Sequence, residues 1–320
     1  MNSLESIAEE IKKRDDFILL GHENFDEDCI ASLFSLKWIL DNLGKKSIIL
    51  LDEEIDEYNF LDIVDSDYSL FDNFELNKSK EYNIIAVDSG DEDRLKQGKD
   101  LLSSFPVFNL DHHEDNTLYG DYNYVNANKA AAAMIIFELA EILNIKINNK
   151  IGECILMGII GDTGAFRYSN TSSEVLELTA KLMKQGVDLY KINRMIYSRN
   201  SYETVLFKGL ALSTIKLSEN GKIAWIEAKK EFFEKAGLDK IDSQNIVNYA
   251  RDIKGVEVGI SFTEKNDEIK VSFRSNEYCK VNEIAAKFSG GGHPRAAGCT
   301  IKDNLNSVEK KVLKEVKKFV

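Results

Sequence analysis

The chain has 320 residues, 43% of them hydrophobic and 30% charged, which is typical of a globular protein rather than a disordered or fibrous one. A formal net charge of −13 argues against a surface that binds long nucleic acid, because neutralising many phosphates requires many lysines and arginines. Short anionic substrates remain possible if metal ions and local basic residues supply positive charge. The length allows one large or two medium domains, and we expect two.

The cysteines and the apolar segments indicate in which cellular compartment the protein is expected. Four cysteines occur at scattered positions, Cys29, Cys154, Cys279 and Cys299. They form no C-x-x-C pair, so neither a zinc knuckle nor a disulfide framework is indicated. Residues 1–16 are charged and lack a signal-peptide core, and the most apolar helical run, residues 130–143, contains Glu138 and Glu141. We therefore expect a cytoplasmic protein without a membrane span.

The first half of the chain alternates short apolar runs with helical patterns. Strands are predicted at residues 17–20, 47–51, 82–87 and 105–110. Helices are predicted at about residues 28–44, 130–143 and 174–185. Residues 52–80 are acidic and show no clear period, and residues 151–160 fit a strand or a buried helix. This alternation predicts an α/β domain with a mainly parallel sheet and helices on both faces.

Polar clusters follow four of these apolar runs. They are His22-Glu23-Asn24-Phe25-Asp26-Glu27-Asp28, Asp88-Ser89-Gly90-Asp91, Asp111-His112-His113 and Gly161-Asp162-Thr163-Gly164. Open α/β folds place their sites at the carboxyl ends of the strands. We therefore interpret all four clusters as strand ends and predict that they meet there in an active site.

Simpler interpretations exist for each cluster. Asp28 would serve as the cap of the following helix, Asp88 as a turn residue, and Cys29 as a small packed residue. The histidines favour a functional interpretation, because each lies beside carboxylates or glycines. The chain has only four, His22, His112, His113 and His293.

Beyond residue 187 the pattern changes. Residues 187–212 are predicted to form one connecting helix. Two β-hairpins are predicted, at residues 213–228 around Asn220-Gly221 and at residues 256–274. A helix at about residues 243–253 and a terminal amphipathic helix at about 305–320 complete a smaller α+β domain.

Together these motifs resemble the DHH phosphoesterase family, and within it the two-domain oligoribonuclease and 3′-phosphoadenosine 5′-phosphate phosphatase group. The four clusters match the family's motifs in order. The C-terminal part resembles the DHH-associated domain through Ser272-Phe273-Arg274-Ser275 and Gly290-Gly291-Gly292-His293-Pro294-Arg295-Ala296-Ala297-Gly298. The chain departs from the pattern at Phe25, Glu27, Ala31 and Ser289, where the family usually has one proline and three glycines.

The resemblance implies a metal-binding catalytic DHH domain at residues 1–190, a helical linker at 191–212 and a substrate-binding domain at 213–320 across a cleft. It also implies two metal ions. The implied ligands are His22 and Asp26 for one ion, Asp28, His112 and Asp162 for the other, and Asp88 as the bridge. Carboxylate and imidazole donors favour Mn²⁺, with Mg²⁺ or another divalent ion as alternatives.

The resemblance also assigns roles around the reacting phosphate. Two metals can activate a water for in-line attack on phosphorus. Asp111 would orient a metal-ligating imidazole, and His113 would face the scissile phosphate as a donor or proton relay. A glycine-rich loop lets backbone N–H groups approach phosphate, and an arginine offers two parallel hydrogen bonds. The substrate-binding residues are expected to be Arg274, Ser275, Gly290, Gly291, Gly292 and His293.

The implied activity releases 5′-mononucleotides from very short oligonucleotides and converts 3′-phosphoadenosine 5′-phosphate into AMP. The same catalytic parts would serve a cyclic di-AMP or linear dinucleotide phosphodiesterase. The departures in the first motif leave a catalytically weakened nucleotide-binding sensor open. The expected partners are short oligonucleotides, dinucleotides or nucleoside 3′,5′-bisphosphates, without long duplex nucleic acid or membranes, and a homodimer is left open.

Overall fold

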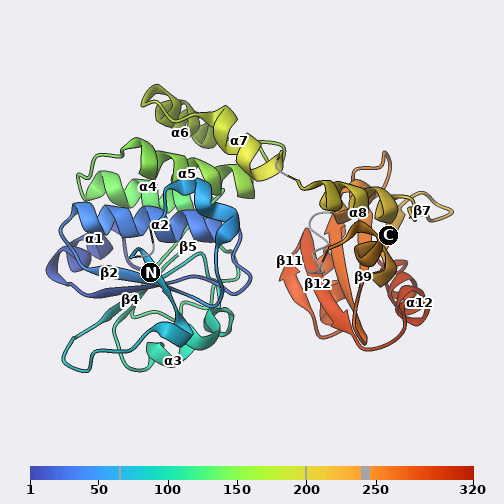
Figure 1. Ribbon diagram of the computed structural model, residues 1–320, viewed down its shortest axis with the longest axis horizontal. Coiled ribbons are helices and arrows are strands. Elements are labelled where there is room, and N and C mark those ends of the chain that lie inside the picture. Colours follow the sequence, from blue (N-terminus) through green and yellow to red (C-terminus); the bar gives the residue numbers. More distant parts are fainter. Residues whose placement is uncertain (65, 199, 239–245) are drawn as a thin grey trace. The chain divides into compact units, whose positions relative to one another are not determined.

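The computed structural model describes residues 1–64, 66–198, 200–238 and 246–320. The chain divides into two compact units, Met1–Arg199 and Asn200–Val320 (Figure 1). Each unit contains one six-stranded sheet. Within the described ranges, no helix combines the length and hydrophobicity that a membrane-spanning segment needs.

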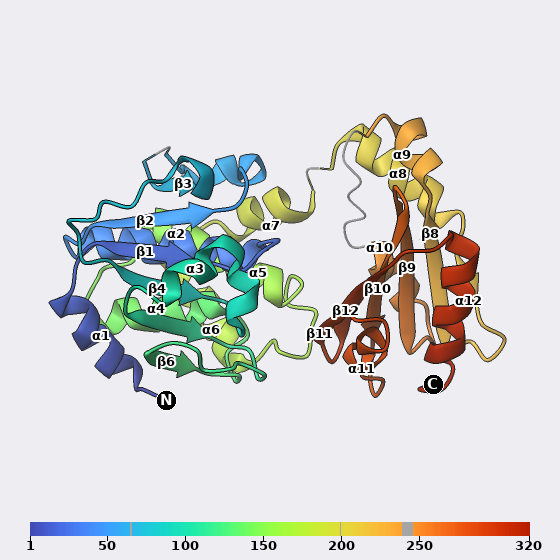
Figure 2. The ribbon, with the colours of Figure 1, turned by 90° about the horizontal axis from the view of Figure 1, so that it is seen from below.

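The first unit contains a parallel sheet with the strand order β3-β2-β1-β4-β5-β6 (Figure 2). Its strands are β1 (Phe17–Leu20), β2 (Ser47–Leu51), β3 (Tyr68–Leu70), β4 (Asn83–Val87), β5 (Val107–Asp111) and β6 (Tyr122–Val125). The central strands β1, β4 and β5 are buried throughout, which explains their continuous apolar sequences. Leu20 pairs with Ala86, and Val87 with Leu110, so these three strands end at the same edge.

Helices cover both faces of this sheet, as predicted. One face packs against α1 (Leu4–Lys13), α2 (Glu27–Asn42) and α4 (Ala132–Ile142). Helix α5 (Asn149–Asp162) lies on α2 and α4, and α6 (Ser173–Lys184) and α7 (Leu189–Tyr197) lie on α5. The other face of the sheet carries short elements, η2 (Phe71–Asn73), η3 (Glu92–Gly98) and α3 (Lys99–Leu102). The short η1 (Asp56–Leu61) also belongs to this unit. Helix α2 is buried on nearly all sides, because it lies against both the sheet and α5.

The structure decides one open alternative about helices and corrects one expectation. Residues 151–160, which fitted a strand or a buried helix, belong to helix α5, which begins after the cap residue Asn148 and is apolar all round because other helices surround it. The predicted single helix at residues 187–212 is two helices, α7 and α8 (Tyr202–Leu212). Ser201 starts the second one, since its hydroxyl accepts a hydrogen bond from the Thr204 N–H at 3.1 Å.

Gly158 in α5 allows this helix to lie close to α2 and α4. A methyl group there would come within 2.5 Å of Asp28 Oδ1 and 2.7 Å of Ala133 Cβ. Overpacking is expected to cost up to about 3 kcal/mol in Gly158→Ala and the alanine to regain roughly 1 kcal/mol of helix propensity, so we expect a net destabilisation of about 1–2 kcal/mol. Urea denaturation measures the change. Gly209→Ala in α8 is the control, because no atom lies within 4 Å of the added methyl group. A stabilised Gly158→Ala protein would contradict the close packing.

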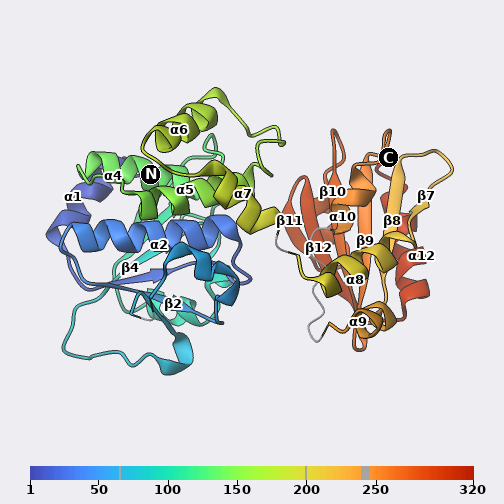
Figure 3. The same ribbon diagram turned by 45° about the horizontal axis from the view of Figure 1, so that its top comes forward.

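The second unit contains a mixed sheet with the order β11-β12-β10-β9-β8-β7 (Figure 3). Its strands are β7 (Lys216–Leu217), β8 (Ile223–Ala228), β9 (Val258–Lys265), β10 (Glu268–Ser275), β11 (Gly291–His293) and β12 (Ala296–Ile301). Both predicted hairpins are confirmed, as the antiparallel pairs β7/β8 and β9/β10. The expected glycine-rich loop instead forms the short edge strand β11, which pairs with β12.

Alternate residues of β8 face opposite sides of this second sheet. Ala224 and Ile226 pack with α8, α9 (Lys230–Ala236) and α10 (Ile246–Arg251). Ile223 packs with α11 (Val281–Ala286) and α12 (Leu305–Val316). The predicted helix at 243–253 is thus observed as α10, while residues 243–245 lie outside the described part.

Candidate metal centre

The end of β1 and the start of α2 supply the first group of polar side chains. Asp26 caps α2, and its carboxylate accepts hydrogen bonds from the N–H groups of Asp28 and Cys29, both at 3.1 Å. The interpretation of Asp28 as the cap of α2 is therefore wrong. Its buried carboxylate instead accepts from Ala132 N–H at 2.5 Å and Ala133 N–H at 3.0 Å, at the start of α4.

Asp88 lies at the centre of the cluster. It follows β4, is 2% exposed and adopts a left-handed backbone conformation with φ of 52°. One carboxylate oxygen lies 3.4 Å from His22 Nε2, and the other lies 3.3 Å from His112 Nε2. The oxygen facing His112 is buried without a properly aligned hydrogen bond. A buried carboxylate oxygen in this state is expected to have a cation as its partner.

His112 and Asp162 complete this group. His112 Nε2 lies 3.3 Å from Asp162 and 3.8 Å from Asp28, while its Nδ1 lies 3.2 Å from the Lys129 carbonyl oxygen. Asp162 is the last residue of helix α5. The expectation that all four clusters follow strands is therefore wrong for this one.

A buried hydrogen-bond network fixes His113. Its Nδ1 lies 2.7 Å from Asp111 Oδ1, and Asn116 Nδ2 donates to the other Asp111 oxygen at 2.6 Å. Asn116 also donates to Asn109 Oδ1 at 2.8 Å. The sequence predicted that Asp111 orients a metal-ligating imidazole, whereas the structure places it against His113, which was not predicted to bind a metal. Asn109 and Asn116 were missed, because an asparagine within a strand and another in a polar turn carry no sequence signal for such a contact.

The electrostatics of the cluster reflect concentrated negative charge in a buried place. Burial, together with Asp88, raises the pKa of Asp28, and burial together with Asp28 raises that of Asp162. Burial alone would lower the pKa of His22, but its contacts with Asp26 and Asp88 prevail and raise it to about 10. The pKa of Asp88 is lowered, because His112 and His22 outweigh its burial.

The donor atoms form three groups that fit metal ions. Within each group the atoms lie no more than 4.8 Å apart. The groups are Asp88-His112-His113, Asp28-His112-Asp162 and His22-Cys29-Asp88. Carboxylate oxygens and imidazole nitrogens are ligands that divalent cations bind readily. Cys29 is fully buried, as its predicted packing role requires, and its sulfur also lies among the donors of the third group.

The predicted substrate-binding residues all belong to the second unit. Arg274 is half-buried in β10 and donates through Nη1 to the Phe273 carbonyl at 3.0 Å. The Ser275 hydroxyl donates to the Cys279 carbonyl at 2.6 Å. Gly290 and Gly292 are needed for close backbone packing, since added methyl groups would come within 2.2 Å of Gly298 O and 2.5 Å of Ala296 O. Gly291 has open space beside it, and the His293 side chain lies outside the described part.

Comparisons with known proteins agree with this geometry. The model of the DHH family N-terminal domain matches residues 16–159, and that of the DHHA1 domain matches residues 221–320. The chain is 30% identical over 314 residues to the bifunctional oligoribonuclease and PAP phosphatase NrnA of Thermus thermophilus, covering 97% of this chain and 92% of that protein.

Two crystal structures show the same fold. An exopolyphosphatase-related protein from Bacteroides fragilis has a TM-score of 0.92 at 24% identity, over 99% of this chain and 96% of the other. RecJ from Thermus thermophilus in complex with Mn²⁺ has a TM-score of 0.52 at 15% identity, over 99% of this chain and 54% of RecJ. With both domain models matched in order and a relative aligned along nearly its whole length, this chain belongs to the DHH family of phosphoesterases.

Proposed function

We propose that this hydrolase releases 5′-mononucleotides from very short oligonucleotides and hydrolyses 3′-phosphoadenosine 5′-phosphate to AMP, in the cytoplasm. The observation that carries the proposal is Asp88, held between His22 and His112 with Asp28 and Asp162 beside them. The name of the Thermus relative, an oligoribonuclease and PAP phosphatase, supports this substrate class.

The buried cluster would hold two divalent ions, and its carboxylate and imidazole donors suit Mn²⁺, with Mg²⁺ as the alternative. The residues that would hold them are His22, Asp26, Asp28, Asp88, His112 and Asp162. When bound, such ions lower the pKa of a water and neutralise phosphoryl oxygens. Asp111 holds His113 through Nδ1, and Nε2 of the protonated imidazole would donate a hydrogen bond or a proton to the substrate phosphate.

The second unit, residues 213–320, would bind the rest of the substrate, residues 1–190 would form the catalytic domain, and residues 191–212 would link the two. The match of the DHHA1 model supports this division. Among the described residues, strand β11 lies at the edge of its sheet with a neighbouring strand on one side only, and the backbone groups of such an edge suit a phosphate or ribose. Together with Arg274, Ser275 and His293, residues Gly290 to Gly292 would form the substrate contact.

Arg274→Ala is expected to raise KM for a 5′-phosphorylated dinucleotide about tenfold with little change in kcat, because a charged hydrogen bond used for binding is lost. Steady-state kinetics with Mn²⁺ measure this effect. The KM of Arg274→Lys should lie between those of the wild type and Arg274→Ala, since lysine keeps the positive charge but lacks the planar guanidinium group that makes two parallel hydrogen bonds. An unchanged KM in Arg274→Ala would remove the arginine from the substrate site.

A substrate panel tests the proposed activity. The Mn²⁺-loaded protein is assayed with 3′-phosphoadenosine 5′-phosphate, linear di- to pentanucleotides and cyclic di-AMP. We expect turnover of the bisphosphate and the shortest linear oligonucleotides. Faster turnover of cyclic di-AMP would indicate a cyclic-dinucleotide phosphodiesterase instead. Binding without any product would indicate a sensor and overturn the proposal.

A further inference from the structure

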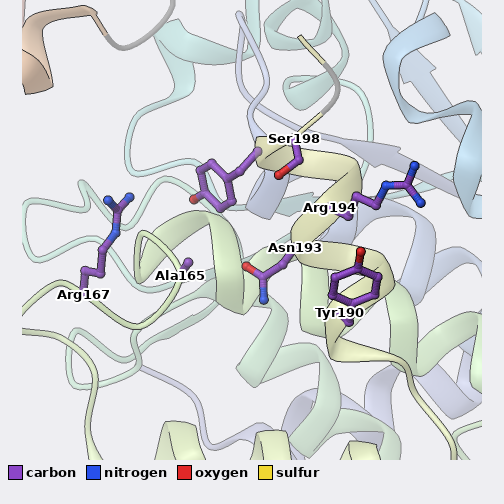
Figure 4. Close-up of a pocket in the computed structure, with 7 residues that line it drawn as sticks. Ala165, Arg167, Tyr190, Asn193, Arg194 and Ser198 are labelled. Atoms are coloured by element: carbon purple, nitrogen blue, oxygen red, sulfur yellow. The ribbon is translucent and has the colours of Figure 1, made fainter.

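A pocket of about 470 Å³ lies in the first unit, between α7 and the segment that follows α5 (Figure 4). Ala165 and Arg167 line it from the segment after α5, and residues of α7 line it from the other side. None of these residues belongs to the metal cluster. Its volume lies within the usual range for small-molecule sites, about 300–1,000 Å³.

Tyr197 connects the pocket to the C-terminal end of helix α5, which carries Asp162. The hydroxyl group of this tyrosine lies 3.3 Å from the carbonyl oxygen of Ile160, two residues before Asp162. Burial, together with the charges of Glu27 and Asp162, raises the pKa of Tyr197 to about 12. Arg167 follows Asp162 by only five residues. A ligand in the pocket would thus lie near the end of α5 from which Asp162 enters the cluster.

Two arginines give the pocket positive charge in a protein with a net charge of −13. Arg167 donates through Nε to the Gly164 carbonyl at 2.7 Å, which holds its guanidinium group in place. Within the described residues, neither Arg167 nor Arg194 lies within ion-pair distance of a carboxylate. By contrast, Lys191 of the same helix α7 pairs with Glu153 at 2.6 Å. The guanidinium groups therefore remain available to an anion.

The α7 side of the pocket forms one stripe along the helix. Tyr190, Asn193, Arg194 and Tyr197 follow the spacing i, i+3, i+4, i+7, which places them on the same face. Tyr190 is 73% exposed and Tyr197 is 38% exposed, so aromatic surface is left open there. The tyrosine rings can stack on nucleobases, the asparagine amide can form hydrogen bonds with base edges, and the arginine can bind phosphate.

We propose that this pocket binds the nucleotide unit next to the scissile phosphate of a linear oligonucleotide. The base lies against Tyr190, and Arg167 contacts the sugar-phosphate backbone. This inference rests on the proposed function and deepens it, because it adds a nucleotide subsite in the first unit. It implies that a substrate without a second nucleoside gains nothing from the pocket.

The test compares two substrates of the Mn²⁺-loaded enzyme, the dinucleotide pApA and bis(p-nitrophenyl) phosphate, which has no nucleoside. Arg167→Ala should raise KM for pApA about tenfold, the effect of one charged hydrogen bond. Tyr190→Ala should raise it by roughly five- to tenfold through lost stacking, while Tyr190→Phe keeps the wild-type value. All three variants should hydrolyse bis(p-nitrophenyl) phosphate like the wild type. Lys184→Ala is the charge control, since this exposed lysine ends α6 and does not line the pocket.

Two results would overturn the inference while leaving the proposed function intact. One is an unchanged KM for pApA in both Arg167→Ala and Tyr190→Ala. The other is an equal loss on both substrates, which would indicate damage to the metal centre. Tyr190 is so exposed that its truncation removes little packing, so this variant stays informative if Arg167→Ala unfolds. Absence of pApA cleavage by the wild type would overturn the proposed function and this inference together.

Discussion

Asp88→Asn is expected to lower kcat/KM by about 1000-fold, the upper end of the loss for one preorganised electrostatic group. The carboxylate of Asp88 lies within 3.4 Å of His22 and 3.3 Å of His112, so it joins two halves of the cluster. An asparagine has the same shape but lacks the charge and one of the two oxygens. Metal-dependent turnover should therefore fail even though the side chain still fits.

The fold should survive this substitution. Asp88 has a φ of 52°, and asparagine tolerates the left-handed region at least as well as aspartate. Asp91→Asn is the matched control: Asp91 caps η3 in the same turn, and asparagine caps helices about as well, so activity should stay within about twofold of wild type. Circular dichroism checks folding, and metal analysis checks occupancy. Full activity in Asp88→Asn would exclude the carboxylate as a shared ligand.

The buried central strands of the first unit could be predicted from the sequence, but the strands at the two edges of its sheet could not. Strands β1 and β2 begin and end as predicted, because a strand covered on both faces is a continuous apolar run. Strands β3 and β6 are short and only half-buried, so their sequences show neither a continuous run nor alternation. Helix α1 was missed as well, although Ser3 caps it and it carries an apolar stripe.

At the site, residue types were predictable and contacts were not. Aspartates and histidines after apolar runs indicated the cluster that the structure brings together around Asp88. Asp162 reaches the cluster from a helix end, because three-dimensional packing of α5 against α2 decides its position. The pocket-lining stripe of α7 from Tyr190 to Tyr197 could not be predicted from the sequence for a similar reason. Helical spacing shows which residues share a face, but only packing shows which face stays uncovered.

Chelation of divalent ions is expected to abolish turnover and to make the free energy of unfolding fall as pH rises from about 6 to 9. The folded pKa of His22 is raised from 6.5 to about 10, so its stabilising contribution is present below 6.5 and lost as pH approaches 10. Asp28 and Asp162 act in the same direction, because a carboxyl with a raised pKa makes the folded state less stable as pH rises from its ordinary value of 3.8 to its value in the folded protein. The lowered pKa of Asp88 gives stability that is constant above its ordinary value of 3.8.

Mn²⁺ should reverse this trend, because a bound cation favours the deprotonated imidazoles and carboxylates that lose stability without it. At a free concentration of 100 times Kd, one bound ion adds about 2.7 kcal/mol, or roughly 5–10 °C in Tm for a unit of this size. Calorimetry of chelated and Mn²⁺-loaded protein at pH 6 and pH 9 measures both effects, with the larger Mn²⁺-induced shift expected at pH 9. Asp88→Asn should show a much smaller shift at either pH. Equal melting temperatures with and without Mn²⁺ would mean that the cluster does not bind the ion, because buried carboxylates this close together cannot gain a cation without gaining stability.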